Sequence, residues 1–337
     1  INVTLYKGSE PLLVAMDIHK EIKAALQMKV NLPSGGYLFI QTTEALTVID
    51  VNSGKFTNSA TQDETILKTN IEELEKISKE IRKDIIEEVY SAKSGHPGGA
   101  LSIADILSVL YFYEMNINPE KPQDENRDRF ILSKGHASPA LYAVLAEKGY
   151  FPKEDLKKFR KLGSYLQGHP DMKHIPGVDM STGSLGQGLS VANGIAMMSK
   201  LDKKGIRVYC LVGDGEIEEG QIWEAAMSAA QYKLDNLCLI VDNNNLQIDG
   251  TIEEVMNSEP IAEKFKSFGF TVMNIDGHDY EEIINAFEVA KEIKGKPTVI
   301  IAKTIKGKGV SFMENQVDWH GKAPSEEEYT QAMKELS

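Results

Sequence analysis

Short apolar runs alternate with amphipathic stretches over most of this chain. From Ile71 onward, apolar residues recur every three or four positions with Glu, Lys and Arg between them, which predicts an amphipathic helix to about Val89. The same periodicity predicts further helices at residues 103–113, 139–148, 189–201 and 280–293. Runs rich in β-branched and aromatic residues predict buried strands at 130–132, 208–212, 237–241, 270–275 and 298–303. This alternation predicts an α/β fold, a parallel sheet flanked by helices on both faces.

The first seventy residues follow a different pattern. An amphipathic stretch at residues 18–28 precedes a Pro-Ser-Gly-Gly turn at 33–36, and two later runs predict hairpin-like strands. Too few strands are predicted here to enclose a core of their own, so we expect a small α+β fragment. We therefore divide the chain into residues 1–70 and residues 71–337.

Composition indicates a soluble globular protein. Its 337 residues are 42% hydrophobic, and the net charge of −13 argues against non-specific nucleic-acid binding. No apolar run approaches the about 18 residues of a membrane helix, and the first residues lack the features of a signal peptide. Cys210 and Cys238 fall within predicted core strands, so we interpret them as buried thiols of a cytoplasmic protein.

Two predicted strands end in groups that can bind a cation. Asp214 lies between Gly213 and Gly215 directly after one strand, and Asn244 lies in a run of three asparagines after the next. Parallel strands bring their carboxyl ends to one edge, where α/β sheets bind ligands. One carboxylate, one amide and one backbone carbonyl would suit a magnesium ion that takes its other ligands from phosphate. Taken alone, Asp214 could equally cap the following helix.

Four of the seven histidines lie in loops that contain glycine or proline. His96 is in Ser-Gly-His-Pro-Gly-Gly, His136 in Ser-Lys-Gly-His-Ala, His169 in Gly-His-Pro and His320 in Trp-His-Gly. The loop at residues 181–188 contains glycines that allow a ligand to approach the backbone closely. An imidazole with a pKa near neutrality can accept or release a proton, so these four histidines are candidate catalytic or binding residues. The remaining histidines are interpreted as ordinary residues: His19, His174 and His278.

These motifs, in this order, resemble the transketolase family over about residues 71–337. The resemblance is to the thiamine diphosphate-binding domain alone, as in the amino-terminal subunit of a split transketolase. It implies that magnesium is held by Asp214, Asn244 and the backbone carbonyl of Leu246. It implies cofactor contacts from His136, Gly183, Leu185, Gly213, Asp214, Gly215 and Asn244. The groups that would face the reacting carbons and hydroxyls are His96, His169 and His320.

The resemblance also implies a reaction. A two-carbon ketol unit would move from a ketose phosphate to an aldose phosphate, as in the pentose phosphate pathway, with thiamine diphosphate as the electron sink. The glutamate that activates the cofactor belongs to the family's pyrimidine domain, whereas Glu219 matches a glutamate at the contact between subunits. We therefore expect no turnover without a carboxyl-terminal, pyrimidine-domain subunit, in a heterotetramer in which this chain dimerises. A deoxyxylulose phosphate or dihydroxyacetone synthase is the alternative within the class.

Residues 1–70 resemble the catalytic core of the ribonuclease E/G family, through the runs at 32–40 and 43–54. In that family the aspartate matching Asp50 binds a catalytic magnesium with a second aspartate from a later strand, and the position of Asn52 is nearby. This chain passes instead into transketolase-like sequence, within a helix that both families share. We expect the segment to be a fused, inactive fragment, and the alternative is a metal-dependent ribonuclease fusion.

Overall fold

The computed structural model describes residues 29–31, 37–42, 47–52 and 62–337, with side chains from residue 67 onward. The chain divides into two units, with the boundary between Glu73 and Leu74. In the first unit, an antiparallel sheet has the order β1 (Lys29–Asn31), β2 (Tyr37–Thr42) and β3 (Thr47–Asn52). The two predicted strands are present, with a third before them. The amphipathic stretch at 18–28 and the turn at 33–36 lie outside the described residues.

The helix α3 (Gln62–Ala92) crosses the join between the two sequence patterns without interruption, as predicted, although it begins earlier than Ile71. Its apolar side chains recur on one face, where Leu74, Ile81 and Val89 are buried. The helix ends before a loop that contains Gly95 at a positive φ of 151°. This loop delivers His96 to the site described below.

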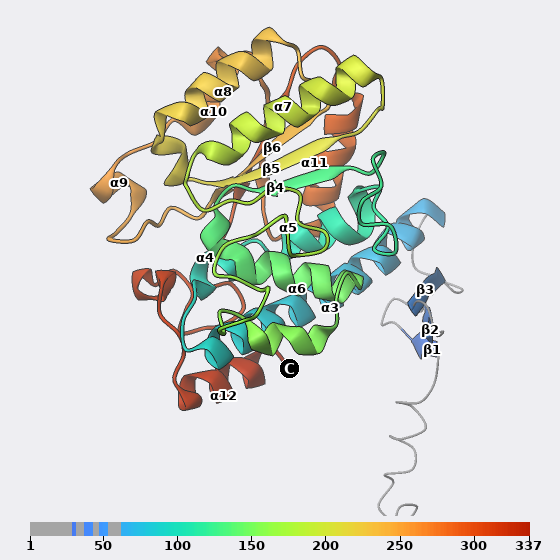
Figure 1. Ribbon diagram of the computed structural model, residues 1–337, viewed down its shortest axis with the longest axis vertical. Helices are drawn as coiled ribbons and strands as arrows, with labels where there is room; N and C mark the ends of the chain where they lie inside the picture. Colours follow the sequence, from blue (N-terminus) through green and yellow to red (C-terminus); the bar gives the residue numbers. More distant parts are fainter. Residues whose placement is uncertain (1–28, 32–36, 43–46, 53–61) are drawn as a thin grey trace, which may run out of the picture. The chain divides into compact units, whose positions relative to one another are not determined.

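The second unit is built on a five-stranded parallel sheet with the order β4-β5-β6-β8-β7 (Figure 1). Its strands are β4 (Arg129–Leu132), β5 (Val208–Gly213), β6 (Leu237–Asn243), β7 (Thr271–Asp276) and β8 (Thr298–Lys303). Gly213 pairs with Asp242, and Asn243 pairs with Lys303, so the strands end at a common edge. The predicted fold class, the five strands and the adjacency of β5 and β6 are all confirmed.

Helices cover both faces of this sheet (Figure 1). One face packs against α7 (Gln187–Asp202), α8 (Gly220–Gln231) and α10 (Ile261–Ser267). On the other face lie α5 (Ala104–Val109), α6 (Ser138–Lys148) and α11 (Tyr280–Glu292). Side chains of β5 alternate between these faces: Cys210 joins the core under α7 and α8, whereas Tyr209 packs edge-on against Phe287 of α11. Burial on both faces explains why the sequences of β5, β6 and β8 are mainly apolar without alternation, whereas the edge strand β7 is only half-buried.

Shorter elements complete the second unit. They are α4 (Pro97–Leu101), η1 (Leu110–Glu114), η2 (Gly135–Ala137), η3 (Lys153–Lys158), η4 (Glu216–Glu218), α9 (Ile252–Val255), η5 (Val317–His320) and α12 (Glu326–Glu335). Both cysteines are buried and free, as predicted. Among the described residues, no helix has the length and apolar character needed to cross a membrane.

Candidate functional site

Asp242, a fully buried residue of β6, joins several elements at the carboxyl edge of the sheet. Its Oδ2 accepts hydrogen bonds from Lys134 Nζ at 2.6 Å, Ser102 Oγ at 2.8 Å and Asn244 Nδ2 at 2.9 Å. Its Oδ1 accepts from the Thr304 hydroxyl. Burial would raise the pKa of Asp242, but Lys134 and the hydrogen bonds outweigh burial and lower it. Asp242 therefore stays ionised and turns the carboxamide nitrogen of Asn244 toward itself.

Asp214 lies directly after β5 and is 2% exposed. Its Oδ1 accepts the N–H of Gly215 at 2.9 Å, and its Oδ2 accepts the N–H of Asn245 at 2.5 Å. Burial and the nearby charge of Asp242 raise the pKa of Asp214 to about 7. A divalent cation at this carboxylate would offset both effects, so the residue fits the predicted magnesium site.

Asn244 and Leu246 belong to one turn at the end of β6. Asn244 Oδ1 accepts the N–H of Leu246 at 3.2 Å, which brings the amide oxygen and the Leu246 backbone into one short segment. Within the part of the chain whose side chains are described, no three His, Cys, Asp or Glu groups converge to hold a metal. Asp214, Asn244 and the Leu246 carbonyl would supply only three oxygen ligands. Such a set suits a magnesium ion whose other ligands are phosphate oxygens and water.

Lys306 is a site residue that the sequence analysis missed. It is 2% exposed, and its Nζ donates to the carbonyls of Leu246 and Gln247, both at 3.3 Å. The same atom lies 3.1 Å from Nδ1 of His320. Burial and the charge of Lys134 lower the pKa of Lys306 to about 8. Its ammonium group connects the proposed magnesium ligands to the histidines. The sequence signal that could have found it was a lysine followed by glycine shortly after a predicted strand.

Three of the four predicted histidines form a cluster. The ring centroids of His96, His136 and His320 are 5.2 to 5.5 Å apart. Burial, followed by neighbouring positive charges, lowers the pKa of His96 to about 4 and that of His320 to about 3. The pKa of His136 is also lowered well below its usual value by burial and by Lys134. At neutral pH these rings are therefore neutral, and Nδ1 of His96 is buried without a hydrogen-bond partner among the described residues. A bound ligand could supply that partner.

His169 lies next to Gly183 and is near enough to His96 to contribute to the lowered pKa of that residue. A Cβ at Gly183, where φ is 156°, would lie 3.2 Å from the His169 ring. Burial and Arg160 lower the pKa of His169. The Gly183 segment in turn packs against the loop after β4, because a Cβ at Gly135 would lie 2.7 Å from the Thr182 hydroxyl. The loop at 181–188 is thus held close to His136, and its Gly183 lies against the His169 ring.

Glu216 joins the loop at 181–188 to the ends of β4 and β5 by hydrogen bonds. Its Oε1 accepts the N–H of Gly186 at 2.9 Å and the Ser133 hydroxyl, and its Oε2 accepts the N–H of Gly213 at 3.0 Å. Leu185, which precedes Gly186, is 39% exposed. Glu216 could not be identified from the sequence, because its hydrogen bonds join three loops that meet only in the folded chain.

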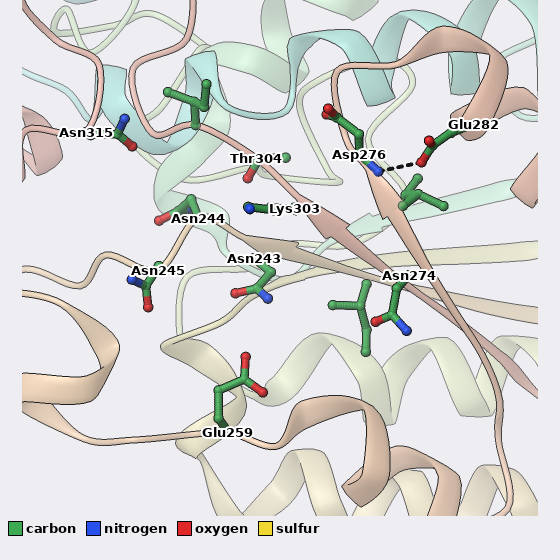
Figure 2. Close-up of a pocket in the computed structure, with 13 residues that line it drawn as sticks. Asn243, Asn244, Asn245, Glu259, Asn274, Asp276, Glu282, Lys303, Thr304 and Asn315 are labelled. Atoms are coloured by element: carbon green, nitrogen blue, oxygen red, sulfur yellow. Dashed lines mark hydrogen bonds between the residues drawn. The ribbon is translucent and has the colours of Figure 1, made fainter.

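A cavity of about 720 Å³ opens at the carboxyl ends of β6, β7 and β8. Figure 2 shows Asn243 and Lys303 in its centre, with Asn245 on one side and Asn274 on the other. Asn244 also lines it, so the predicted magnesium ligand lies at its border. The residues predicted for a ribonuclease site, Asp50 and Asn52, lie in β3, and their side chains fall outside the described ones.

Two family models match the chain. Residues 74–337 match "Transketolase, thiamine diphosphate binding domain", and residues 1–85 match the ribonuclease E/G family. The two matches overlap within α3. This overlap lies in the helix that the sequence analysis identified as shared by both families.

Individual relatives cover the same part of the chain. A subunit of an apulose-4-phosphate transketolase from Phocaeicola vulgatus is 46% identical over 267 residues, which are 79% of this chain and 95% of the relative. The 6-deoxy-6-sulfo-D-fructose transketolase subunit SqwG of Clostridium sp. is 48% identical over 256 residues, 76% of this chain and 93% of the relative. The crystal structure of a Campylobacter jejuni transketolase superposes with a TM-score of 0.74 at 42% identity and 78% coverage of this chain. The matched region is only 42% of that transketolase chain.

Proposed function

This chain belongs to the transketolase family, and we propose that it is the amino-terminal subunit of a split, magnesium-dependent transketolase. It would transfer a two-carbon ketol unit from a ketose phosphate to an aldose phosphate. The observation that carries the proposal is the convergence of Asp214, Asn244, Leu246 and Lys306 at one sheet edge, beside three neutral imidazoles. The two subunit relatives act, by their names, on different sugars, so the proposal concerns the reaction class and not one substrate.

The side chains divide the work by position. Thiamine diphosphate, when bound, supplies the electron sink for cleaving a carbon–carbon bond next to a carbonyl. Asp214, Asn244 and the Leu246 carbonyl would hold magnesium, and the Lys306 ammonium would neutralise charge on the diphosphate. The lack of side chains at Gly213 and Gly215 would let the phosphate groups approach the backbone closely.

The histidines would handle protons of the sugar. His96 and His320 are neutral at physiological pH. His96 can accept a proton from a substrate hydroxyl, whereas His320, whose Nδ1 accepts from Lys306, would donate a hydrogen bond to the substrate from Nε2. His136, which is more deeply buried, would contact the cofactor from the loop after β4. His169 is more exposed and would meet the substrate next to Gly183.

A second protein chain with the pyrimidine-binding domain would complete the site. Relatives that are named as transketolase subunits support a partner chain. Leu185, in the loop at 181–188, and Glu219, which lies beside Gly186 of that loop, are both exposed. A second chain could cover them. We propose a cytoplasmic heterotetramer in which two copies of this chain pair with two partner chains, and no turnover by this chain alone.

Calorimetric titration of thiamine diphosphate with Mg²⁺ into the full-length chain tests the proposal. Asp214→Asn keeps the side-chain volume but removes the charge, and we expect at least about 100-fold weaker binding. The matched control is Asp249→Asn, which changes an exposed carboxylate in the loop after β6 and should bind the cofactor as wild type does. Equal affinity in all three proteins, or no binding by wild type either alone or with a pyrimidine-domain partner, would contradict the proposal.

A further inference from the structure

His278, in the loop after β7, connects a buried carboxylate to the backbone next to Lys306. Its Nδ1 lies 2.7 Å from Asp105 Oδ2, and its Nε2 accepts the N–H of Ile305 at 2.9 Å. Because Nε2 is the acceptor, the proton of the neutral ring lies on Nδ1 and is donated to Asp105. Both ring nitrogens are thus used, and the ring orientation is fixed by two elements far apart in the sequence.

Asp105 is itself firmly held. Arg82 of α3 donates to both carboxylate oxygens, at 2.9 and 2.5 Å, and the Tyr280 hydroxyl donates at 2.6 Å. Despite burial, which raises it, the pKa of Asp105 is lowered by Arg82 and the hydrogen bonds. Arg82 Nε also donates to the carbonyl of Lys308 at 3.1 Å. The Arg82–Asp105 ion pair therefore holds the backbone on both sides of Lys306. It acts through His278 at Ile305 and through Arg82 at Lys308.

We propose that His278 is a positioning residue for the cofactor site. By accepting the Ile305 N–H, it fixes the backbone from which the Lys306 side chain reaches the magnesium-binding turn and His320. This inference rests on the proposed function, because it assigns the Lys306 ammonium to the diphosphate. The loop after β8 has further hydrogen bonds, from the Thr304 hydroxyl to Asp242 and from the Gly307 N–H to the Gly98 carbonyl. These contacts would keep it folded when the imidazole contact is lost.

Variants of His278 can separate its two hydrogen bonds. In His278→Gln the carboxamide oxygen can reach the position of Nε2 and still accept from Ile305. In His278→Asn the shorter amide can serve Asp105 but leaves the Ile305 N–H without its acceptor. Tyr280→Phe is the matched control, because it removes another hydrogen bond to Asp105 without touching the loop.

The test measures thiamine diphosphate affinity with Mg²⁺ by calorimetry and backbone amide exchange over the loop, both on the full-length chain. We expect about tenfold weaker binding and faster Ile305 exchange for His278→Asn, which corresponds to the loss of about one hydrogen bond. His278→Gln and Tyr280→Phe should remain within about twofold of wild type. In a Lys306→Met background, His278→Asn should weaken binding no further, since its effect acts through Lys306. His278→Ser, which leaves room for water, is measured in parallel in case the asparagine variant does not fold.

Three outcomes would overturn the inference. If His278→Asn exchanges faster but binds as wild type does, the contact exists without positioning the site. If its effect persists unchanged in the Lys306→Met background, His278 does not act through Lys306. If Tyr280→Phe weakens binding as much as His278→Asn, the role is general stability. If wild type does not bind the cofactor, while His278→Asn still exchanges the Ile305 amide faster than wild type, the proposed function is rejected and the inference with it.

Discussion

Asp242→Asn removes one buried charge at nearly constant volume, and the structure indicates a large loss of stability. Four donors converge on this carboxylate, from Lys134, Ser102, Asn244 and Thr304. A carboxamide has one acceptor oxygen and one NH₂ group, so it cannot accept from all four groups. With its nitrogen toward Lys134 it meets three donors, and with its nitrogen toward Thr304 that hydroxyl must turn and accept instead. The substitution also leaves the ammonium of Lys134, whose side chain is 3% exposed, without its anion.

The expected magnitude follows from that unpaired lysine. Removing one partner of a buried ion pair costs about 3–5 kcal/mol, because the remaining charge stays desolvated. At about 2–4 °C per kcal/mol for a domain of this size, Tm should fall by about 6–20 °C. The contribution also depends on pH. Since the pKa of Asp242 is lower in the folded chain, its stabilisation is complete above the unfolded-state pKa of about 4 and is lost as pH falls through the folded-state value.

Urea and thermal unfolding at pH 7, followed by tryptophan fluorescence, measure this loss because Trp223 and Trp319 both lie in the second unit. The matched control is Glu125→Gln, which breaks the exposed ion pair with Lys204 and should leave stability unchanged. A loss below about 1 kcal/mol for Asp242→Asn, or equal losses for both variants, would refute the argument that the buried lysine depends on this carboxylate.

Further predictions concern the cofactor lysine, the loop glycine and the buried imidazoles. Lys306→Met should weaken Mg²⁺-dependent thiamine diphosphate binding by at least about tenfold, whereas Lys308→Met in the same loop should change it by less than about twofold; calorimetry that finds equal effects would argue against a diphosphate contact. Gly186→Ala should lower the unfolding free energy more than Gly149→Ala. Both have positive φ, 82° and 92°, but a Cβ at 186 would lie 2.7 Å from another Cβ, whereas nothing lies within 4 Å at 149; similar losses in urea titrations would contradict this. His96 has its pKa lowered to about 4 in the folded chain, so the unfolded chain binds a proton first and stability should fall as pH drops from about 6.5 toward 4. His96→Gln should reduce that slope between pH 7 and 5, and an unchanged slope would show that His96 does not contribute.

The strands β5, β6 and β8 could be predicted from sequence because burial on both faces leaves few polar positions in each run. The bounds of β8 match the prediction, and β7 is shifted by a single residue. The helix α8 was missed, since the residues that it buries are mainly small, such as Ala225, Ala226 and Ala229, and alanine gives a weak periodic signal. α10 was missed because seven residues are too few for a clear helical period.

The site residues that could be predicted are those whose chemistry follows directly from a strand end. Asp214 and Asn244 are of this kind, and the structure places both at the sheet edge. Their roles as ligands stay a prediction. Lys134 and Asp242 could not be identified as an ion pair, because they are 108 residues apart and meet only through the order β4-β5-β6. His278 was interpreted as an ordinary residue for the same reason, since its partners belong to α5 and to the segment after β8.

The arrangement of charge at this edge predicts that magnesium and the diphosphate bind cooperatively. Lys134 is paired with Asp242, whereas Asp214 and Lys306 form no ion pair among the described residues and contact backbone groups and an imidazole. A cation alone would neutralise Asp214 but add to the positive charge near Lys306. An anion alone would neutralise Lys306 but add to the negative charge near Asp214. A magnesium diphosphate unit carries both signs, so each component should raise the affinity for the other by the same factor, as linkage requires. Titrating Mg²⁺ at several thiamine diphosphate concentrations, and the converse, measures that factor. We expect at least about tenfold in wild type and little coupling in Asp214→Asn. Independent binding in wild type would show that the two charges do not belong to one site.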